Sequence, residues 1–397
     1  MKPDILLVSN GYGEAAIAGY IAHAIAARAP AATVEHFPLV GAFAREAWPP
    51  AVGPQQSMPS GGLVTNWNVP QFLRDLGAGL AGLTVRQCRF LSTQKQRDVV
   101  IAVGDVYCLA LCTMFARRPV VFVATAKSQY VAPHSPLECS IARRAITTFA
   151  RDEPTAAALR RAGVRARYAG NVMMDGLQRS GADLGSIAGA LHIGVLPGSR
   201  GDAPRNAERT AWRLRALADL LAQRGRVLQA FVSVAPSVDA VAIGEAVQRA
   251  GIELRARPSG VVSATGSLRN LHVTLVRNAF GDLVNAVEIV FGQAGTANEQ
   301  AAGLGRPVIA AAEQGELPDR MRWYRMRQKR LLGDALLVLP AEPAVFAERI
   351  AELLDDPRRL EQMATSGRQR MGNPGGAEAI AGAALELAAH GAVAAER

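Results

Sequence analysis

Residues Val287–Ile309 read VEIVFGQAGTANEQAAGLGRPVI, and this stretch decides the fold. An apolar run rich in β-branched residues stops at Gly292, good helix formers follow Gly295, and the helical pattern ends at Gly303. The stretch therefore predicts a strand, a tight turn, a helix and a second strand, which is the repeating unit of a parallel α/β sheet.

The start of this helix is a candidate phosphate site. Thr296 is predicted to cap the helix, with Glu299 three residues further on. Backbone N–H groups in a first helical turn attract an anion, and Gly295 has no side chain to keep a phosphate away. The alternative is an ordinary strand–helix crossover that binds nothing.

Composition limits the number of domains and the class of protein. A chain of 397 residues suits two domains, and 49% hydrophobic with 20% charged residues is typical of a folded globular protein. The net charge of +10 suits a phosphate-bearing ligand, nucleic acid or an anionic membrane, without choosing among them.

The cysteines and the apolar runs indicate the cellular compartment. Four cysteines without CxxC spacing are expected to be reduced thiols rather than metal ligands. We find no signal peptide and no apolar run long enough to span a bilayer, so we expect a cytoplasmic protein whose membrane contact, if any, is peripheral.

The first predicted strand runs into the loop Ser9–Glu14, SNGYGE. Gly11, Gly13 and Ala16 have the spacing of a dinucleotide fingerprint, and Glu35 follows about twenty residues downstream. A nicotinamide site is therefore a rival interpretation. Any Rossmann-like domain with a ligand at its first strand end would use a similar loop.

Polar residues also follow the next two predicted strands. Asp105 follows Gly104 at the end of the strand predicted over Asp98–Val103, and it is either a helix cap or a catalytic carboxylate. Lys127 and Tyr130, after Val120–Ala124, are candidates for contacts with a phosphate or a hydroxyl.

The chain then divides. Val40–Trp67 is predicted as a long loop, a helix is expected over Pro70–Gln94, and Gly170–Gly189 is expected to link two domains. The domains expected are residues 1–170 and 190–365, both doubly wound, with no strand-only region.

The first strand of the second domain ends in LPGSR, Leu196–Arg200. Arg200 in that loop is able to hold a phosphate with two parallel hydrogen bonds. It would supply the positive charge that the glycine turn at Gly295 lacks.

Three motifs together resemble the lipid-A-disaccharide synthase family, and most closely its branch of related proteins. They are YAGNVMMD at Tyr168–Asp175, LPGSR at Leu196–Arg200 and GTANEQ at Gly295–Gln300. Their order and spacing match over nearly the full length. The loops Ser9–Glu14, Val103–Val106 and Thr125–Ser128 also recur in that branch.

The resemblance implies a GT-B glycosyltransferase: two Rossmann-like domains facing across a cleft, with a final helix, residues 376–397, packing back on the first domain. The second domain would bind a nucleotide-sugar, UDP-linked in the family, and no further cofactor. The implied donor residues are Gly198, Ser199, Arg200, Gly295, Thr296, Ala297, Asn298, Glu299, Gln300 and Gln328. In this chain Gln300 occupies the family's usual carboxylate position, and Glu299 is the acid one residue earlier.

The first domain would present the acceptor. The implied acceptor-side residues are Asn10, Gly11, Tyr12, Gly13, Lys127 and Ser128. The related branch has His-Gly-Glu-Asp where this chain has Tyr12-Gly13-Glu14-Ala15. Asp105 and Glu14 are then the carboxylates placed to deprotonate an acceptor hydroxyl, in an inverting displacement that needs no metal.

The segment Arg320–Arg330, RMRWYRMRQKR, is a basic helix that would lie on an anionic membrane beside a lipid acceptor, or simply face solvent. Nucleic acid is not expected as a partner, because no binding motif accompanies the charge. Two other functions stay open for this fold: a sugar-nucleotide epimerase and a non-catalytic nucleotide-sugar-binding protein.

Overall fold

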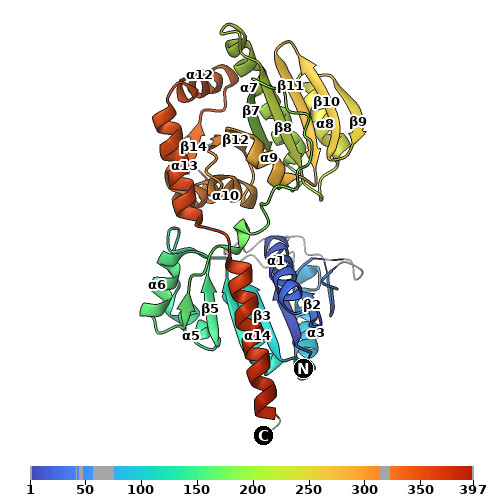
Figure 1. The fold of residues 1–397 in the computed structure, drawn as a ribbon, viewed down its shortest axis with the longest axis vertical. Helices are drawn as coiled ribbons and strands as arrows, with labels where there is room; N and C mark the ends of the chain where they lie inside the picture. The colour runs from blue at the N-terminus through green and yellow to red at the C-terminus, as the bar shows by residue number, and fades with distance from the viewer. Residues whose placement is uncertain (1, 42, 44–47, 57–75, 313–321, 396–397) are drawn as a thin grey trace. The chain divides into compact units, whose positions relative to one another are not determined.

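The computed structural model describes residues 2–41, 43, 48–56, 76–312 and 322–395. The chain divides into two compact α/β units, each with its own sheet and its own hydrophobic core (Figure 1). Unit 1 comprises residues 1–175 and 374–397, and unit 2 comprises residues 176–373. The predicted class, α/β with two Rossmann-like units, is confirmed. Most of the loop predicted at 40–67 and the start of the helix predicted at 70–94 lie outside the described residues.

Unit 1 is built on a six-stranded parallel sheet of order β2-β1-β3-β4-β5-β6. Its strands are β1 (Asp4–Ser9), β2 (Thr33–Pro38), β3 (Val99–Gly104), β4 (Val120–Ala124), β5 (Thr147–Ala150) and β6 (Ala166–Arg167). The central strands are buried throughout because helices cover both faces, which explains their continuous apolar sequence. The strand order reverses between β1 and β3, so a crevice for a ligand is expected at the carboxyl ends of those two strands.

The helices of unit 1 follow the alternation expected of a doubly wound sheet. They are α1 (Tyr12–Arg28), α3 (Leu80–Ser92), α4 (Val106–Leu111), the π-helix η1 (Cys112–Ala116), α5 (Pro136–Ala142), α6 (Glu153–Arg161), the short η2 (Val172–Met174) and α14 (Gly376–Ala395).

The C-terminal helix α14 belongs to unit 1 and packs along α1 (Figure 1). Asp175 fixes its start, because the carboxylate accepts hydrogen bonds from the backbone N–H groups of Gly375 and, at 2.7 Å, of Ala377. The last aspartate of the YAGNVMMD motif is therefore a helix cap that joins two ends of unit 1 that are distant in sequence.

Unit 2 has an eight-stranded sheet of order β14-β13-β12-β7-β8-β11-β10-β9. The strands are β7 (Leu191–Leu196), β8 (Leu228–Val234), β9 (Leu254–Ser259), β10 (Val262–Leu268), β11 (Leu271–Arg277), β12 (Ile289–Gly292), β13 (Val308–Ala311) and β14 (Leu336–Leu339). The order reverses between β7 and β12, which makes their carboxyl ends the crevice of this unit.

The expectation that the chain has no strand-only region is wrong. β9, β10 and β11 follow one another without a helix, and β10 runs antiparallel to both neighbours. β10 reads VSATGSL and is only partly buried, so it lacks the apolar signal of a central strand. Its turns use left-handed backbone at Gly260 and Arg269.

The helices of unit 2 cover the sheet and its edges. They are α7 (Ala203–Ala222), α8 (Ala240–Arg249), α9 (Phe280–Ala286), α10 (Thr296–Gly303), α11 (Trp323–Leu332), η3 (Gly333–Ala335), α12 (Pro343–Leu354) and α13 (Pro357–Met371). No helix among the described residues is both long and apolar enough to cross a membrane.

The segment expected as a linker is divided between the units after Asp175. Its second part is held to unit 2 by Asp282, whose carboxylate accepts hydrogen bonds from the backbone of Ser180, Gly181 and Ala182 and from the Ser180 hydroxyl. A polar, glycine-rich sequence here adopts a defined path rather than a free tether.

Candidate functional site

The two loops singled out in unit 2 leave the sheet side by side. Gly292 at the end of β12 pairs with Leu196 at the end of β7, and the N–H of Gln293 donates to the Leu196 carbonyl at 2.9 Å. LPGSR and the glycine turn before α10 therefore flank the crevice of unit 2, where open α/β sheets bind their ligands.

The LPGSR loop is anchored by its backbone and leaves its arginine exposed. Asn206 donates to the Pro197 carbonyl at 2.9 Å, and the Ser237 hydroxyl donates to the Ser199 carbonyl at 2.9 Å. Gly198 has φ +110°, a conformation that favours glycine, and no atom lies within 4 Å of the place a Cβ would occupy. The Arg200 guanidinium is exposed and makes no hydrogen bond or ion pair with another described residue.

The start of α10 differs in one detail from the sequence prediction. Thr296 is the first helical residue rather than the cap: Gly295 is the N-cap, and no side chain caps the helix. The N–H groups of Asn298 and Glu299 donate to the Gly295 carbonyl, which leaves those of Thr296 and Ala297 as the first-turn donors for a ligand. The missing side-chain cap leaves this helix start open to an anion.

Two of the predicted donor residues point into unit 2. Asn298 is fully buried and lies so close to Gly292 that a Cβ there would be 2.1 Å from its Oδ1. Its amide donates to Gln328 at 3.2 Å, and Gln328 in turn donates to the carbonyls of Ala294 (3.0 Å) and Gly295 (3.1 Å). Both side chains therefore hold the loop. Contacts of Glu299 and Gln300 with a ribose stay a prediction.

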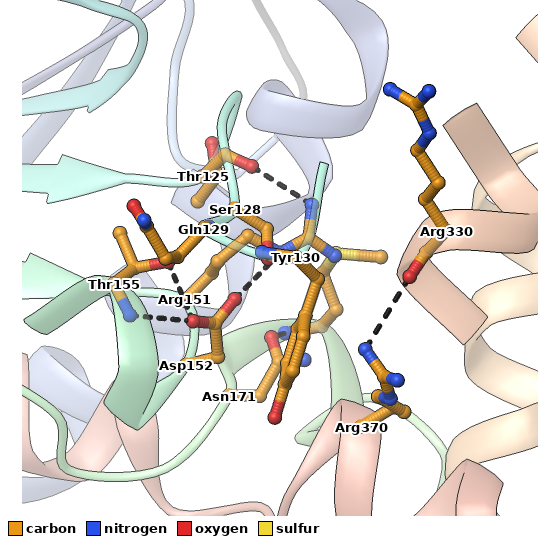
Figure 2. A network of polar contacts seen from close by, with 11 residues as sticks. Thr125, Ser128, Gln129, Tyr130, Arg151, Asp152, Thr155, Asn171, Arg330 and Arg370 are labelled. Atoms are coloured by element: carbon orange, nitrogen blue, oxygen red, sulfur yellow. Dashed lines mark hydrogen bonds and ion pairs between the residues drawn. The ribbon is translucent and has the colours of Figure 1, made fainter. Parts of the chain in front are cut away.

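The basic helix is also more embedded than a surface helix would be. Arg325 of α11 is fully buried and donates to the Gln293 side chain, and the Lys329 ammonium donates to the carbonyls of Gly333 and Leu336. Arg370 of α13 donates to the Arg330 carbonyl at 3.4 Å (Figure 2). Part of this charge therefore serves to fix the helix. Arg320 lies outside the described residues.

In unit 1, Asn10, Glu14 and Asp105 gather at the ends of the neighbouring strands β1 and β3. A Cβ on Gly104 would be 2.0 Å from Asn10 Oδ1, and a Cβ on Gly11 would be 2.3 Å from a carboxylate oxygen of Glu14. The two glycines therefore give these side chains their room. Tyr12, where the related branch has a histidine, is exposed and contacts Phe43.

Asp105 is a helix cap in the structure, and it is also a perturbed acid. One carboxylate oxygen accepts hydrogen bonds from the N–H groups of Tyr107 and Cys108, both at 3.0 Å. Burial raises the pKa of Asp105 despite the opposing hydrogen bonds from Cys108, Tyr107 and Asn10. A carboxylate with a raised pKa is a better proton acceptor than an ordinary aspartate. Both predicted roles, cap and base, are thus compatible with one geometry.

The loop after β4 is held by polar contacts within unit 1. Lys127 forms an ion pair with Glu138 at 2.6 Å, so its ammonium is engaged rather than free for a phosphate. The buried hydroxyl of Ser128 accepts from the N–H of Tyr130 at 3.2 Å, which closes the loop on itself. Glu138 also completes a capping box with Ser135 at the start of α5.

Residues that the sequence analysis did not single out complete this edge. Figure 2 shows Arg151 donating to the Thr125 carbonyl at 3.2 Å and Gln129 donating to Thr155 at 2.8 Å. His134 lies in the same region: burial lowers its pKa, and its charged neighbours are Glu138, Lys127 and Asp152. The sequence does contain one sign of this arrangement, because the S-x-x-E pattern at Ser135–Glu138 predicts a capping box.

Glu35, required by the nicotinamide interpretation, has a structural partner. It forms an ion pair with Arg97, a buried arginine that also pairs with Asp4 at 2.6 Å. No group of three or more histidine, cysteine or acidic side chains among the described residues is arranged to hold a metal. All four cysteines are free thiols, and three of them are buried.

Comparison with known proteins defines the class of fold. No protein-family model matches the chain, and no curated protein matches its sequence. A structure from Listeria monocytogenes, provisionally named a UDP-N-acetylglucosamine 2-epimerase, is similar with a TM-score of 0.60 and 15% identity, over 97% of this chain and 96% of that one.

Two further solved structures are similar to this chain over almost its full length. The UDP-GlcNAc 2-epimerase from Neisseria meningitidis, bound to UDP-GlcNAc, gives a TM-score of 0.55 at 14% identity over 96% of this chain and 99% of that one. The glycosyltransferase SnogD from Streptomyces nogalater gives 0.53 at 17% identity over 98% and 99%. The chain is therefore a protein of the GT-B fold.

Proposed function

We propose that this protein is a glycosyltransferase that takes its sugar from a UDP-sugar. The observation that carries the proposal is the pairing, at the crevice of unit 2, of an exposed arginine on the β7 loop with an uncapped helix start after β12. One structure of similar fold is an epimerase bound to UDP-GlcNAc, which supports the choice of ligand, and another is named a glycosyltransferase, which supports the choice of reaction.

The chemistry of this pairing suits a departing diphosphate. As the bond from the sugar to the diphosphate breaks, negative charge grows on the phosphate oxygens. The Arg200 guanidinium and the N–H groups of Thr296 and Ala297 would neutralise that charge without reorganising. The exposed position of Arg200 and the room around Gly198 support an approach by a bulky anion.

The acceptor would be activated on unit 1. In an inverting, metal-independent displacement, Asp105 takes the proton of the acceptor hydroxyl while the oxygen attacks the anomeric carbon. The raised pKa of Asp105 and its place at the strand-order reversal support this role, with Glu14 as the second carboxylate. The motif resemblance to lipid-A-disaccharide synthases favours a lipid-linked acceptor at the membrane periphery.

A sugar-nucleotide epimerase is the second candidate, since two of the similar structures bear that name. The two functions differ in their need for an acceptor. An epimerase would convert UDP-GlcNAc to its C2 epimer with no acceptor present, whereas a transferase would release UDP only with an acceptor.

The direct test is calorimetric titration of UDP into the wild type and into Arg200→Ala. We expect Arg200→Ala to weaken UDP binding by about tenfold or more, as for the loss of one charge-assisted hydrogen-bonding partner. Arg224→Ala is the matched control, because Arg224 is an exposed arginine just after the C-terminal end of α7 and pairs with Asp355. Equal UDP affinity in Arg200→Ala and wild type would show that Arg200 does not take part in UDP binding.

A further inference from the structure

The loop between β12 and α10 is held from one side by a single helix, α11. Gln328 is buried, and its side-chain NH2 donates to two successive backbone carbonyls, those of Ala294 and Gly295. Its own carbonyl accepts from the buried Asn298 amide. One turn earlier on the same helix, Arg325 donates to the Gln293 side chain. Helix α11 thus holds three residues of the turn, Gln293, Ala294 and Gly295. It also contacts α10, the helix after the turn, through Asn298.

The consequence follows from the planarity of the peptide bond. The carbonyl of Ala294 shares a trans peptide with the N–H of Gly295, and the carbonyl of Gly295 shares one with the N–H of Thr296. In a trans peptide the two groups point in opposite directions. When both carbonyls face Gln328, both N–H groups must face away from it.

Two successive N–H groups that point the same way form a concave donor surface that binds anions. Neither the Gly295 N–H nor the Thr296 N–H donates to a backbone carbonyl of the described chain. No atom lies within 4 Å of the position that a Cβ on Gly295 would take, so the surface is not covered from that direction.

We infer that Gln328 is a positioning residue that turns the N–H groups of Gly295 and Thr296 toward the donor diphosphate, beside the N–H of Ala297, rather than a contact to the donor sugar. The inference rests on the proposed function, because it takes a nucleotide diphosphate as the anion. Gln328 acts through the loop: its hydrogen bonds fix the two peptide planes before the ligand arrives, which reduces the entropic cost of binding.

The test uses full-length Gln328→Glu, in which an oxygen replaces the NH2 at almost the same size. The variant loses both hydrogen bonds to the loop carbonyls and keeps an acceptor for Asn298. Gln229→Glu is the matched control. Gln229 is a buried glutamine near the start of β8 that donates to Gly185 at 2.9 Å and accepts from Ile187 at 2.7 Å. Gln328→Met, uncharged and of similar size, replaces Gln328→Glu if that variant does not fold.

The affinities of UDP, uridine and a UDP-sugar are measured for each variant, together with thermal stability. We expect the Gln328 variants to bind UDP about tenfold more weakly or worse, with uridine affinity unchanged, while Gln229→Glu binds UDP like the wild type. The ratio of UDP to uridine affinity separates this role from a general loss of structure.

Three results would overturn the inference alone. The first is unchanged affinity for UDP and the UDP-sugar in the Gln328 variants. The second is a loss with the UDP-sugar but not with UDP, which would indicate a sugar contact, and the third is an equal loss for uridine and UDP. A wild type that does not bind UDP would instead remove the proposed function, so the two failures are distinguishable.

Discussion

Gly104 shows at the scale of one residue how the unit 1 edge is assembled. Its φ of +135° lies in the region that favours glycine, and a Cβ would overlap the Asn10 side chain. Because Gly104 lacks that Cβ, Asn10 approaches the end of β3 and contributes a hydrogen bond to the Asp105 carboxylate. The glycine before the acid is therefore part of the acid's environment, which the strand-end pattern alone did not reveal.

His36 gives a pH-dependent prediction at the same scale. It is buried on β2, lies 2.8 Å from the Ser9 hydroxyl, and burial lowers its pKa from 6.5 to about 4. Between these values the unfolded chain holds a proton that the folded chain does not, so stability is lost as the pH falls from 6.5 towards 4. The loss amounts to about 3 kcal/mol when complete.

Urea unfolding at pH 7 and at pH 4.5 measures this loss. His36→Gln should reduce the difference in unfolding free energy between the two pH values by about 2 kcal/mol or more. His390→Gln, at an exposed histidine of α14, should leave the difference as in the wild type. An unchanged difference in His36→Gln would show that other groups cause it.

At the scale of elements, the central strands of both sheets are runs of buried apolar residues, and the sequence predicted these runs as strands that alternate with helices. It missed β10, because a half-exposed strand with serine, threonine and glycine has no distinct period. It also assigned the α10 cap to Thr296, since a threonine with a glutamate three residues on is the usual capping box. The glycine turn before Thr296 instead supplies the cap residue.

The α14 helix depends on a contact between distant parts of unit 1. Asp175→Ala removes the acceptor for the N–H groups of Gly375 and Ala377 and should lower the free energy of unfolding by about 0.5–2 kcal/mol. Glu378→Ala is the control at the same helix start, because Glu378 makes an exposed ion pair with Arg28. Denaturant unfolding compares them, and a smaller loss in Asp175→Ala than in the control would contradict the capping role.

At the scale of the whole molecule, the sequence predicted two Rossmann-like units and the pairing of the LPGSR loop with the glycine turn. That pairing could be predicted from the sequence because both loops directly follow apolar strands, and strand ends of a parallel sheet share one edge. The inward orientation of Asn298 and Gln328 could not be predicted from the sequence. It depends on the packing of α11 against the loop, and helical spacing in a basic segment gives no sign that Arg325 is buried.

The central claim is that a nucleotide diphosphate binds at the edge of unit 2 between Arg200 and the start of α10. Hydrogen–deuterium exchange of the full-length protein with and without UDP tests it most directly, because it reports on every segment. We expect slower exchange in peptides covering 197–201 and 293–299. Protection confined to the loop at residues 9–16 of unit 1, or no protection at saturating UDP, would contradict the account.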